Sequence, residues 1–297
     1  MKKSAQNTVV TEGKNDYNKS EITHEEAGDM VAISAETKDI GEDLRMIAGF
    51  RLLDDDFMTM VFDKNIEATE LLLKVILGRN DIKVIEVVAQ REYKNPVTGG
   101  RSITLDIYAE DSEGKVYDIE VQRADAGADA HRARFHSSMI DTKMLKEKQK
   151  FKEIHDSYVI FITENDVMDM GLPLYHVERT ITETGKLFND GSHIIYVNGS
   201  YKNDEDPVGR LMHDFRCTSA VDMFYPELAK PVRHFKETEG GQKAMCKAME
   251  DRIEKERINV LAKDIENLMD TMRWTAEQAM SALKVSDEDK EVLLKKL

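Results

Sequence analysis

The sequence contains few cysteines and no long hydrophobic run. Of its 297 residues only two are cysteines, Cys217 and Cys246, in distant segments. Their separation excludes a disulfide framework and a cysteine-rich zinc site, and it predicts a reducing, cytoplasmic location. No apolar stretch approaches the roughly 18 to 20 residues that span a bilayer, and residues 1–10 lack the apolar core of a signal peptide. We therefore expect no contact with a membrane and no secretion.

An overall excess of basic residues is also missing. The chain has 42 Lys and Arg against 57 Asp and Glu, a formal net charge of −15. Nucleic-acid binding usually needs a basic surface, so this average argues against such a partner. The charge is unevenly distributed, however, because residues 131–152 contain seven Lys and Arg against two acids. This segment could still contact phosphates.

Composition divides the chain into three parts. Residues 1–45 are polar, acidic and poor in aromatics, which predicts a disordered or loosely ordered tail. Residues 46–238 carry the alternating patterns of a folded domain. Residues 239–297 are rich in Ala, Met, Lys and Glu and lack proline, which predicts a helical C-terminal extension. Apolar residues at alternating spacings of three and four cover about two heptads of it, so the extension could dimerise but is short for a stable coiled coil.

The order of elements in the folded domain predicts an α/β fold. Apolar residues at helical spacing alternate with runs rich in Val and Ile and with turns that contain Gly and Asn. The expected elements are a helix over 57–76, strands over 82–93, 102–110 and 115–122, a helix within 129–152, and strands over 158–163 and 193–198. We predict a helix, three strands, a helix and a strand, forming a small mixed sheet flanked by helices.

Two of these strands form a hairpin with candidate metal ligands. Alternation predicts that Ile103, Leu105, Ile107 and Ala109 share one face of the first strand, and that Asp118, Glu120 and Gln122 share the polar face of the second. A three-residue loop with Gly114 in the left-handed position would place Asp106 directly opposite Glu120. Two carboxylates so close repel each other unless a shared proton or a cation lies between them. Mg²⁺ would suit carboxylate and carbonyl oxygens, whereas a solvated sheet face would explain the same alternation without a metal.

Other polar residues near the hairpin have a simpler interpretation. Asp56 or a neighbouring Asp at the start of the first helix could add a carboxylate to the site, but such residues more often cap a helix. His131 and His136 are five residues apart, the wrong spacing for a shared metal face on a helix. We expect both histidines at the surface or in contact with phosphate.

Five motifs together are similar to one family. They are Leu52-Leu53-Asp54-Asp55-Asp56-Phe57-Met58, Leu105-Asp106-Ile107-Tyr108, Asp118-Ile119-Glu120-Val121-Gln122-Arg123, Arg132-Ala133-Arg134 and Tyr196-Val197-Asn198-Gly199. As a set they resemble the PD-(D/E)XK nuclease family transposases, which are related to recombination-promoting nucleases. The resemblance runs from about residue 52 to residue 250. It implies a restriction-endonuclease-like core followed by a helical C-terminal extension.

The resemblance implies a metal-dependent DNA endonuclease that hydrolyses phosphodiester bonds in transposition or recombination. Asp106 and Glu120 would hold Mg²⁺ or Mn²⁺, with the Val121 carbonyl as a backbone ligand. The metal would lower the pKa of a bound water and stabilise charge that builds on the phosphate.

The implied site departs from the family pattern at one catalytic position. Gln122 stands where the superfamily usually has a lysine; a glutamine can hydrogen-bond a water but supplies no cation. Arg123, Arg132 and Arg134 would contact DNA phosphates. Given the net charge, we expect this binding to weaken quickly with added salt.

Two other functions remain open from the sequence. The departure at Gln122 and the acidic composition also suit a catalytically weak nuclease fold that acts as a DNA-binding or protein-assembly module. A third interpretation is RNA cleavage, which matched RNA and DNA substrates would distinguish.

Overall fold

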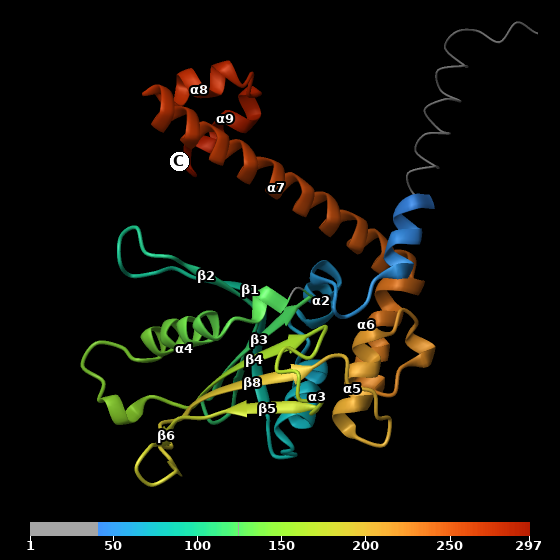
Figure 1. Ribbon diagram of the computed structural model, residues 1–297. Coiled ribbons are helices and arrows are strands. Elements are labelled where there is room, and N and C mark those ends of the chain that lie inside the picture. The colour runs from blue at the N-terminus through green and yellow to red at the C-terminus, as the bar shows by residue number, and fades with distance from the viewer. Residues whose placement is uncertain (1–40, 124) are drawn as a thin grey trace, which may run out of the picture. The chain divides into compact units, whose positions relative to one another are not determined.

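A computed structural model describes residues 41–123 and 125–297 (Figure 1). The tail predicted over residues 1–45 lies almost wholly outside the described residues. Leu44–Leu297 form one compact unit. None of the described helices is long and apolar enough to cross a membrane.

The helices and strands follow the predicted order. The helices are α2 (Asp55–Phe62), α3 (Ile66–Leu77), α4 (Ala130–Met144), α5 (Pro207–Arg216), α6 (Pro226–Glu237), α7 (Glu239–Met272), α8 (Ala276–Ala282) and α9 (Asp287–Leu294), with short 3-10 helices at Asp125–Ala128, Phe151–Glu153 and Ala220–Asp222. The strands are β1 (Val84–Tyr93), β2 (Ile103–Asp111), β3 (Val116–Gln122), β4 (Ser157–Thr163), β5 (Leu174–Val177), β6 (Thr180–Ile181), β7 (Lys186–Leu187) and β8 (Ser192–Asn198).

A mixed sheet of six strands forms the centre of the domain, in the order β1-β2-β3-β4-β8-β5. β1, β2 and β3 pair antiparallel, β3, β4 and β8 pair parallel, and β5 returns antiparallel at the far edge. Every residue of β4 is buried, as expected for a continuously apolar central strand. The predicted mixed sheet flanked by helices is confirmed.

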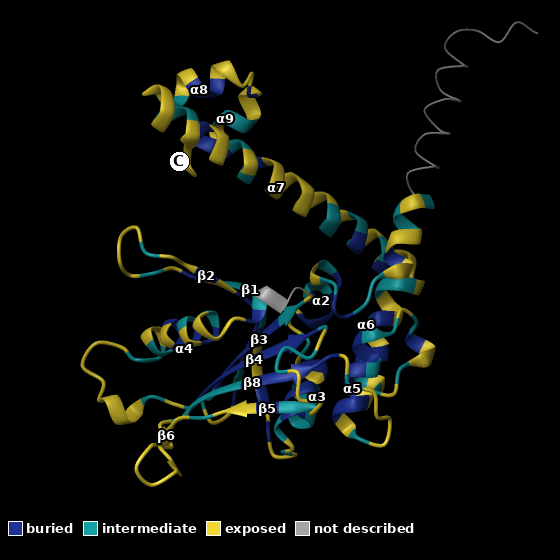
Figure 2. Cartoon of the chain, viewed as in Figure 1, coloured by how far each residue is buried: buried dark blue, intermediate teal, exposed yellow. Residues whose placement is uncertain are grey.

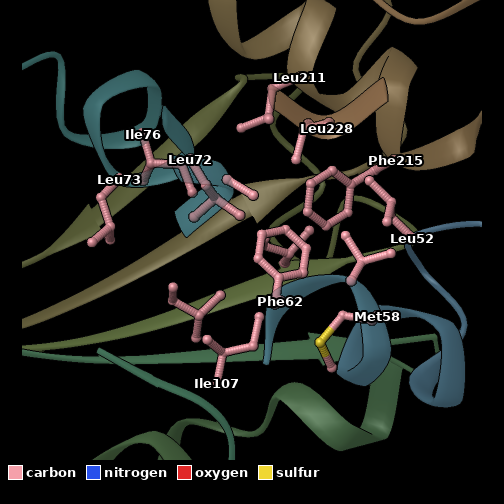
Figure 3. Close-up of a cluster of buried hydrophobic side chains, with 14 of the residues drawn as sticks. Leu52, Met58, Phe62, Leu72, Leu73, Ile76, Ile107, Leu211, Phe215 and Leu228 are labelled. Atoms are coloured by element: carbon pink, nitrogen blue, oxygen red, sulfur yellow. The ribbon is translucent and has the colours of Figure 1, made fainter. Parts of the chain in front are cut away.

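Helices cover both faces of the sheet. On one face, α2, α3, α5 and α6 pack against the strands around Phe62 and Phe215, whose ring centroids lie 6.1 Å apart (Figure 3). On the other face, α4 packs over Val159 and Phe161 of β4. The central strands are buried, whereas the β6–β7 hairpin and most of α7 are exposed (Figure 2). The second face, under α4, carries the site described below.

Two predicted helices differ in extent from the structure. The helix expected over 57–76 is two helices, because the chain turns at Asn65, whose side chain accepts a hydrogen bond from the N–H of Ala68 at 3.2 Å and caps α3. Gly78 ends α3 in the left-handed conformation, as predicted. The basic helix expected within 129–152 ends at Met144, so most of the lysines that follow lie in a loop.

The C-terminal extension is helical, and its apolar residues pack within the chain. Residues at the predicted heptad positions of α7, including Ile258 and Ile265, form a cluster with Met280 and with Leu293 of α9. Thr275 and Gln278 form a capping box at the start of α8. A homodimer through these helices finds no support, since the central heptad residues are already covered by α8 and α9.

Two adjacent glycines in the first turn of α7 provide a matched test of the α6–α7 packing. A Cβ at position 241 would lie 2.0 Å from the carbonyl oxygen of His234, whereas at Gly240 it would meet nothing within 4 Å. We expect Gly241→Ala to destabilise the fold by about 1–3 kcal/mol through overpacking. Gly240→Ala should be neutral or stabilise by up to about 1 kcal/mol. Urea unfolding of both variants measures the change in the free energy of unfolding. Equal changes would contradict the close approach of Gly241 to α6.

Candidate active site

The β2–β3 hairpin closes as the sequence predicts. Gly114 has φ 79°, and its N–H donates to the carbonyl of Asp111 at 3.0 Å. Main-chain pairs then run from Glu110–Val116 to Ile107–Ile119. The predicted register is confirmed over this ladder. Its continuation sets Asp106 opposite Glu120.

Beyond that ladder the side chains of Asp106 and Glu120 connect the two strands. The N–H of Asp106 donates to Oε1 of Glu120 at 3.1 Å, and the N–H of Val121 donates to Oδ2 of Asp106 at 3.1 Å. Each carboxylate thus accepts a main-chain hydrogen bond from the opposite strand. The structure therefore brings these two predicted ligands together and fixes both of them through the backbone.

The apolar face predicted for β2 is wrong, because the strand changes face at Asp106. Ile103 and Leu105 pack in the core under α4, whereas Ile107 and Ala109 pack in the core on the opposite side of the sheet. The neighbouring strand β1 is irregular at the same level, since Gln90 has φ 53°. Strict alternation requires an unbroken ladder, and the break occurs where the carboxylates lie.

Three carboxyl groups meet here with too little positive charge around them. Burial, followed by the nearby Glu120 charge, raises the pKa of Asp106 to about 7. Burial, followed by the charge of Asp118, raises the pKa of Glu120 to about 8. Burial likewise raises the pKa of Asp118 to about 8, and its Oδ1 is buried without a hydrogen-bond partner. This donor set fits a divalent cation, which would supply the missing charge.

Arg132 of α4 reaches this acidic group. Its Nη2 donates to Oε2 of Glu120 at 2.5 Å, and its Nη1 donates to Oε1 of Gln122 at 3.2 Å. Arg134 is two residues further along, about 200° around the helix, and is exposed. The structure places the first of these predicted arginines at the site and the second away from it.

Comparison with known proteins agrees with this arrangement. Residues 60–204 match the family model of the PD-(D/E)XK nuclease family transposases. This region of the chain is therefore similar to that family. No curated protein and no solved structure matches the chain. The matched region contains the whole hairpin, α4, β4 and β8, so the resemblance inferred from the motifs is confirmed.

Gln122, at the family's usual lysine position, lies beside a cation. Its side chain accepts a hydrogen bond from Arg132 and lies close to Gly127, where an added Cβ would be 2.1 Å from Oε1 of the glutamine. Gln122 is therefore held between α4 and the loop that precedes it. The neighbouring guanidinium of Arg132 places a positive charge beside this position.

Asp118 and His136 belong to the site, and sequence reasoning missed both. Asp118 is 0% exposed and His136 is 3% exposed, with 2.8 Å between Oδ2 of the aspartate and Nδ1 of the histidine. Their ligand atoms and those of Glu120 all lie within 4.8 Å of one another. Of the two alternatives expected for His136, a surface position is wrong and a contact with phosphate stays a prediction, whereas His131 is exposed. The four-residue spacing of Arg132 and His136 was the available signal, because it places both on one face of α4.

Arg123 is held in a ring of ion pairs rather than beside the carboxylates. Its Nη1 lies 2.9 Å from Oδ1 of Asp54, and its Nε lies 3.3 Å from Oε2 of Glu164. Arg51 pairs with the same two acids. The ring joins the start of α2 to the ends of β3 and β4. Since the Arg123 side chain is still 58% exposed, its predicted contact with DNA stays a prediction.

The aspartates at the start of α2 do not join the metal ligands. Asp54 is the N-cap residue but makes no side-chain capping bond, and Asp55 and Asp56 both pair with Arg252 of α7. These pairs tie the C-terminal extension to the first helix of the domain. The charge of Asp55 still reaches the site, as a smaller cause of the raised pKa of Asp106 after burial and Glu120.

A cavity of about 500 Å³ opens next to Arg132, between α4 and the start of β2. Its charged lining consists of Arg101 and Arg132 against Asp129, whose carboxylate accepts the N–H of His131 at 2.7 Å and so caps α4. Arg101 was not expected at the site, because it precedes the strand that carries the ligands. The cavity gives the acidic site a basic neighbour.

A second group of potential ligands in the described residues is His213, Asp214 and Cys217. Both oxygens of Asp214 accept main-chain N–H groups, those of Phe224 and Tyr225 at 2.8 Å each, and so tie α5 to the turn before α6. Burial raises the pKa of the Cys217 thiol to about 11, which disfavours the thiolate that binds metals. We interpret this group as a structural connection between α5 and the turn before α6.

Proposed function

We propose that the chain is a metal-dependent DNA endonuclease that acts in transposition or recombination. The observation that carries the proposal is the fixed pair of Asp106 and Glu120, two carboxylates held side by side by main-chain hydrogen bonds from opposite strands. Holding two buried carboxylates together is unfavourable without a cation. The similarity of residues 60–204 to a nuclease family supports the same chemistry.

Asp106, Glu120 and the carbonyl oxygen of Val121 would hold Mg²⁺ or Mn²⁺, whose preferred ligands are oxygens. Such an ion lowers the pKa of a bound water and stabilises negative charge on the phosphate. Asp106, Asp118 and Glu120 carry three negative charges when ionised, and Arg132 carries one positive charge. One divalent ion would therefore balance the charge of the group.

The remaining residues of the site would bind and orient the substrate. Arg132 is 36% exposed, so its guanidinium can reach a phosphate that enters from the adjacent cavity. Arg101, which also lines that cavity, would contact a neighbouring phosphate of the strand. Gln122 would orient a water by hydrogen bonding while Arg132 supplies the cation. The exposed Arg134 would add at most a peripheral, salt-sensitive contact.

A catalytically weak module for DNA binding or protein assembly is the second candidate. The ion pair between Arg132 and Glu120 favours it, because a guanidinium 2.5 Å from Glu120 competes with a metal for that carboxylate. Under this alternative the fold would bind DNA and cleave it slowly or not at all.

Cleavage of supercoiled plasmid by the purified full chain tests the proposal. We expect nicked and linear products with Mg²⁺ or Mn²⁺, and none when EDTA removes the metal. An RNA substrate of matched sequence should be cleaved much more slowly. Absence of cleavage with either metal, under conditions where a control nuclease cuts, would contradict the nuclease. DNA binding without cleavage would then favour the second candidate.

The proposed location is the cytoplasm, where cellular reductants would keep Cys217 and Cys246 as thiols. Within the described residues, Cys217 and Cys246 form no disulfide. DNA is the proposed partner, and its affinity should fall steeply with added salt, because the basic residues at the site are few and the chain is acidic overall.

A further inference from the structure

Asp118 and His136 are buried beside the proposed metal ligands but have no part in the chemistry so far. Burying a carboxylate and an imidazole is unfavourable unless each group is hydrogen-bonded. The contact of 2.8 Å between them satisfies one oxygen of Asp118 and one nitrogen of His136. The other nitrogen of His136 faces Arg132, so the pair also has a link to the active site.

The direction of the hydrogen bonds follows from Arg132. Nε of Arg132 lies 3.5 Å from Nε2 of His136, and a guanidinium can only donate. Nε2 must therefore accept, which places the imidazole proton on Nδ1. From Nδ1 it is donated to Oδ2 of Asp118. Arg132, His136 and Asp118 thus form a hydrogen-bonded chain that runs from the guanidinium through the imidazole to the carboxylate.

All three nitrogens of the Arg132 guanidinium have a partner. Besides His136, Glu120 and Gln122, the carbonyl of Gly127 accepts from Nη1 at 3.1 Å. The ring of Phe161 lies 5.9 Å from the guanidinium carbon. The contact with His136 engages Nε, which the other three hydrogen bonds leave without a partner.

We propose that Asp118 and His136 are positioning residues that act through Arg132, holding its guanidinium in the orientation that contacts a substrate phosphate. This role rests on the proposed function for the nature of the substrate. The link to Arg132 itself follows from the hydrogen-bonded chain. Asp118 fixes the tautomer of His136, and His136 fixes Arg132.

A double-mutant cycle tests the proposal. DNA affinity is measured by fluorescence anisotropy in the presence of Ca²⁺. Like Mg²⁺, this hard cation takes oxygen ligands and would occupy the proposed metal site. We expect Arg132→Gln to weaken binding roughly 10- to 100-fold, the value of a charge-assisted hydrogen bond. His136→Phe should weaken it less, and the double variant should bind no more weakly than Arg132→Gln alone. Effects that multiply in the double variant would overturn the proposal.

Arg134→Gln is the matched control, because it removes the same charge from the same helix. The fold-change in Kd for DNA caused by Arg134→Gln should multiply with the fold-change caused by His136→Phe, since no hydrogen bond or ion pair joins these two side chains. Coupling of equal size in both cycles would mean that His136→Phe disturbs α4 as a whole, and would overturn the proposal.

Mn²⁺ affinity, measured by calorimetry, is a readout that does not depend on cleavage. Arg132→Gln removes a cation from Glu120 and should tighten Mn²⁺ binding roughly tenfold, equivalent to about 1.4 kcal/mol. His136→Phe should shift the affinity in the same direction, whereas damage to the fold would weaken it. If the wild type binds no DNA, the Mn²⁺ affinities of these two variants test the positioning role of His136.

The outcomes separate the two proposals. If the wild type binds DNA without cutting it, the proposed nuclease activity is contradicted. The two double-mutant cycles, with Arg132→Gln and with Arg134→Gln, can still be measured. If circular dichroism shows that His136→Phe does not fold, His136→Asn replaces it. That variant stays polar but is too short to reach Arg132 and Asp118 together.

Discussion

Replacing Glu120 with glutamine should reduce DNA cleavage by at least about 1,000-fold. The amide keeps the shape of the side chain and can still accept the N–H of Asp106, which Glu120 binds at 3.1 Å. It supplies no negative charge to a divalent ion, however, and charge stabilisation by such an ion is worth several kcal/mol. A loss of about 4 kcal/mol corresponds to roughly a 1,000-fold slower reaction.

Single-turnover cleavage at saturating Mg²⁺ measures this effect. Glu110→Gln is the matched control, since Glu110 lies on β2, the other strand of the same hairpin, and accepts the hydroxyl of Tyr108 at 2.9 Å. That variant should cut at close to the wild-type rate. Cleavage by Glu120→Gln within about tenfold of the wild type would remove Glu120 from the metal site.

Asp106→Asn should have an effect of similar size for the same reason. The asparagine can still accept the N–H of Val121, so the hairpin keeps its cross-strand bond. Alanine would lose that bond as well as the charge, and a loss of cleavage by Asp106→Ala would therefore mix catalysis with stability. Equal urea midpoints for wild type and Asp106→Asn show that the comparison is valid.

The hairpin geometry could be predicted because it depends on local sequence. A glycine in the left-handed position fixes the loop, and the loop fixes the register. The change of face at Asp106 could not be predicted in the same way. It depends on the irregular backbone of Gln90 in the neighbouring strand, and no pattern in β2 itself reports it.

The residues of α4 show how far helical periodicity can be used. Arg132 and His136 share a face by spacing alone, and Arg134 does not. The burial of His136 could not be derived from that spacing, because it depends on how α4 docks over Asp118 and Phe161. The burial of Asp118 could not be predicted either. On an alternating strand a polar residue is expected to face solvent, and here α4 covers it.

The C-terminal heptads mark the limit of such patterns. Spacing identifies apolar positions on α7 but does not say whether a second chain or the same chain covers them. Here α8 and α9 provide the cover. Their capping signals, Thr275 with Gln278 and Ser286 with Asp289, were readable in the sequence, but the return of these helices onto α7 was not.

The metal-free protein is expected to lose stability as the pH rises from about 4 to about 8. Unfolded Asp and Glu release their protons near pH 4, whereas the folded pKa is about 7 for Asp106 and about 8 for Asp118 and Glu120. Between these values the folded state binds more protons than the unfolded state. The contribution of these three groups to the free energy of unfolding is therefore greatest below pH 4 and is lost as the pH rises through 7 to 8.

A divalent metal should reverse this trend. Binding needs ionised carboxylates, so metal affinity rises with pH. At a free concentration about 100 times Kd, binding adds about 2.7 kcal/mol to the free energy of unfolding. Urea unfolding at pH 5, 6.5 and 8, with EDTA or with Mg²⁺, measures both effects. We expect the difference in the free energy of unfolding between Mg²⁺ and EDTA to increase toward pH 8.

Two controls separate the buried site from the general acidity of the chain. A net charge of −15 also opposes folding at high pH, but added salt screens that surface repulsion more than it screens buried groups. Glu120→Gln removes one buried ionisable group and should reduce the pH dependence in EDTA while abolishing most of the stabilisation by Mg²⁺. A pH dependence that disappears in 0.5 M salt, or that is unchanged in Glu120→Gln, would show that the loss of stability comes from the surface and not from the site.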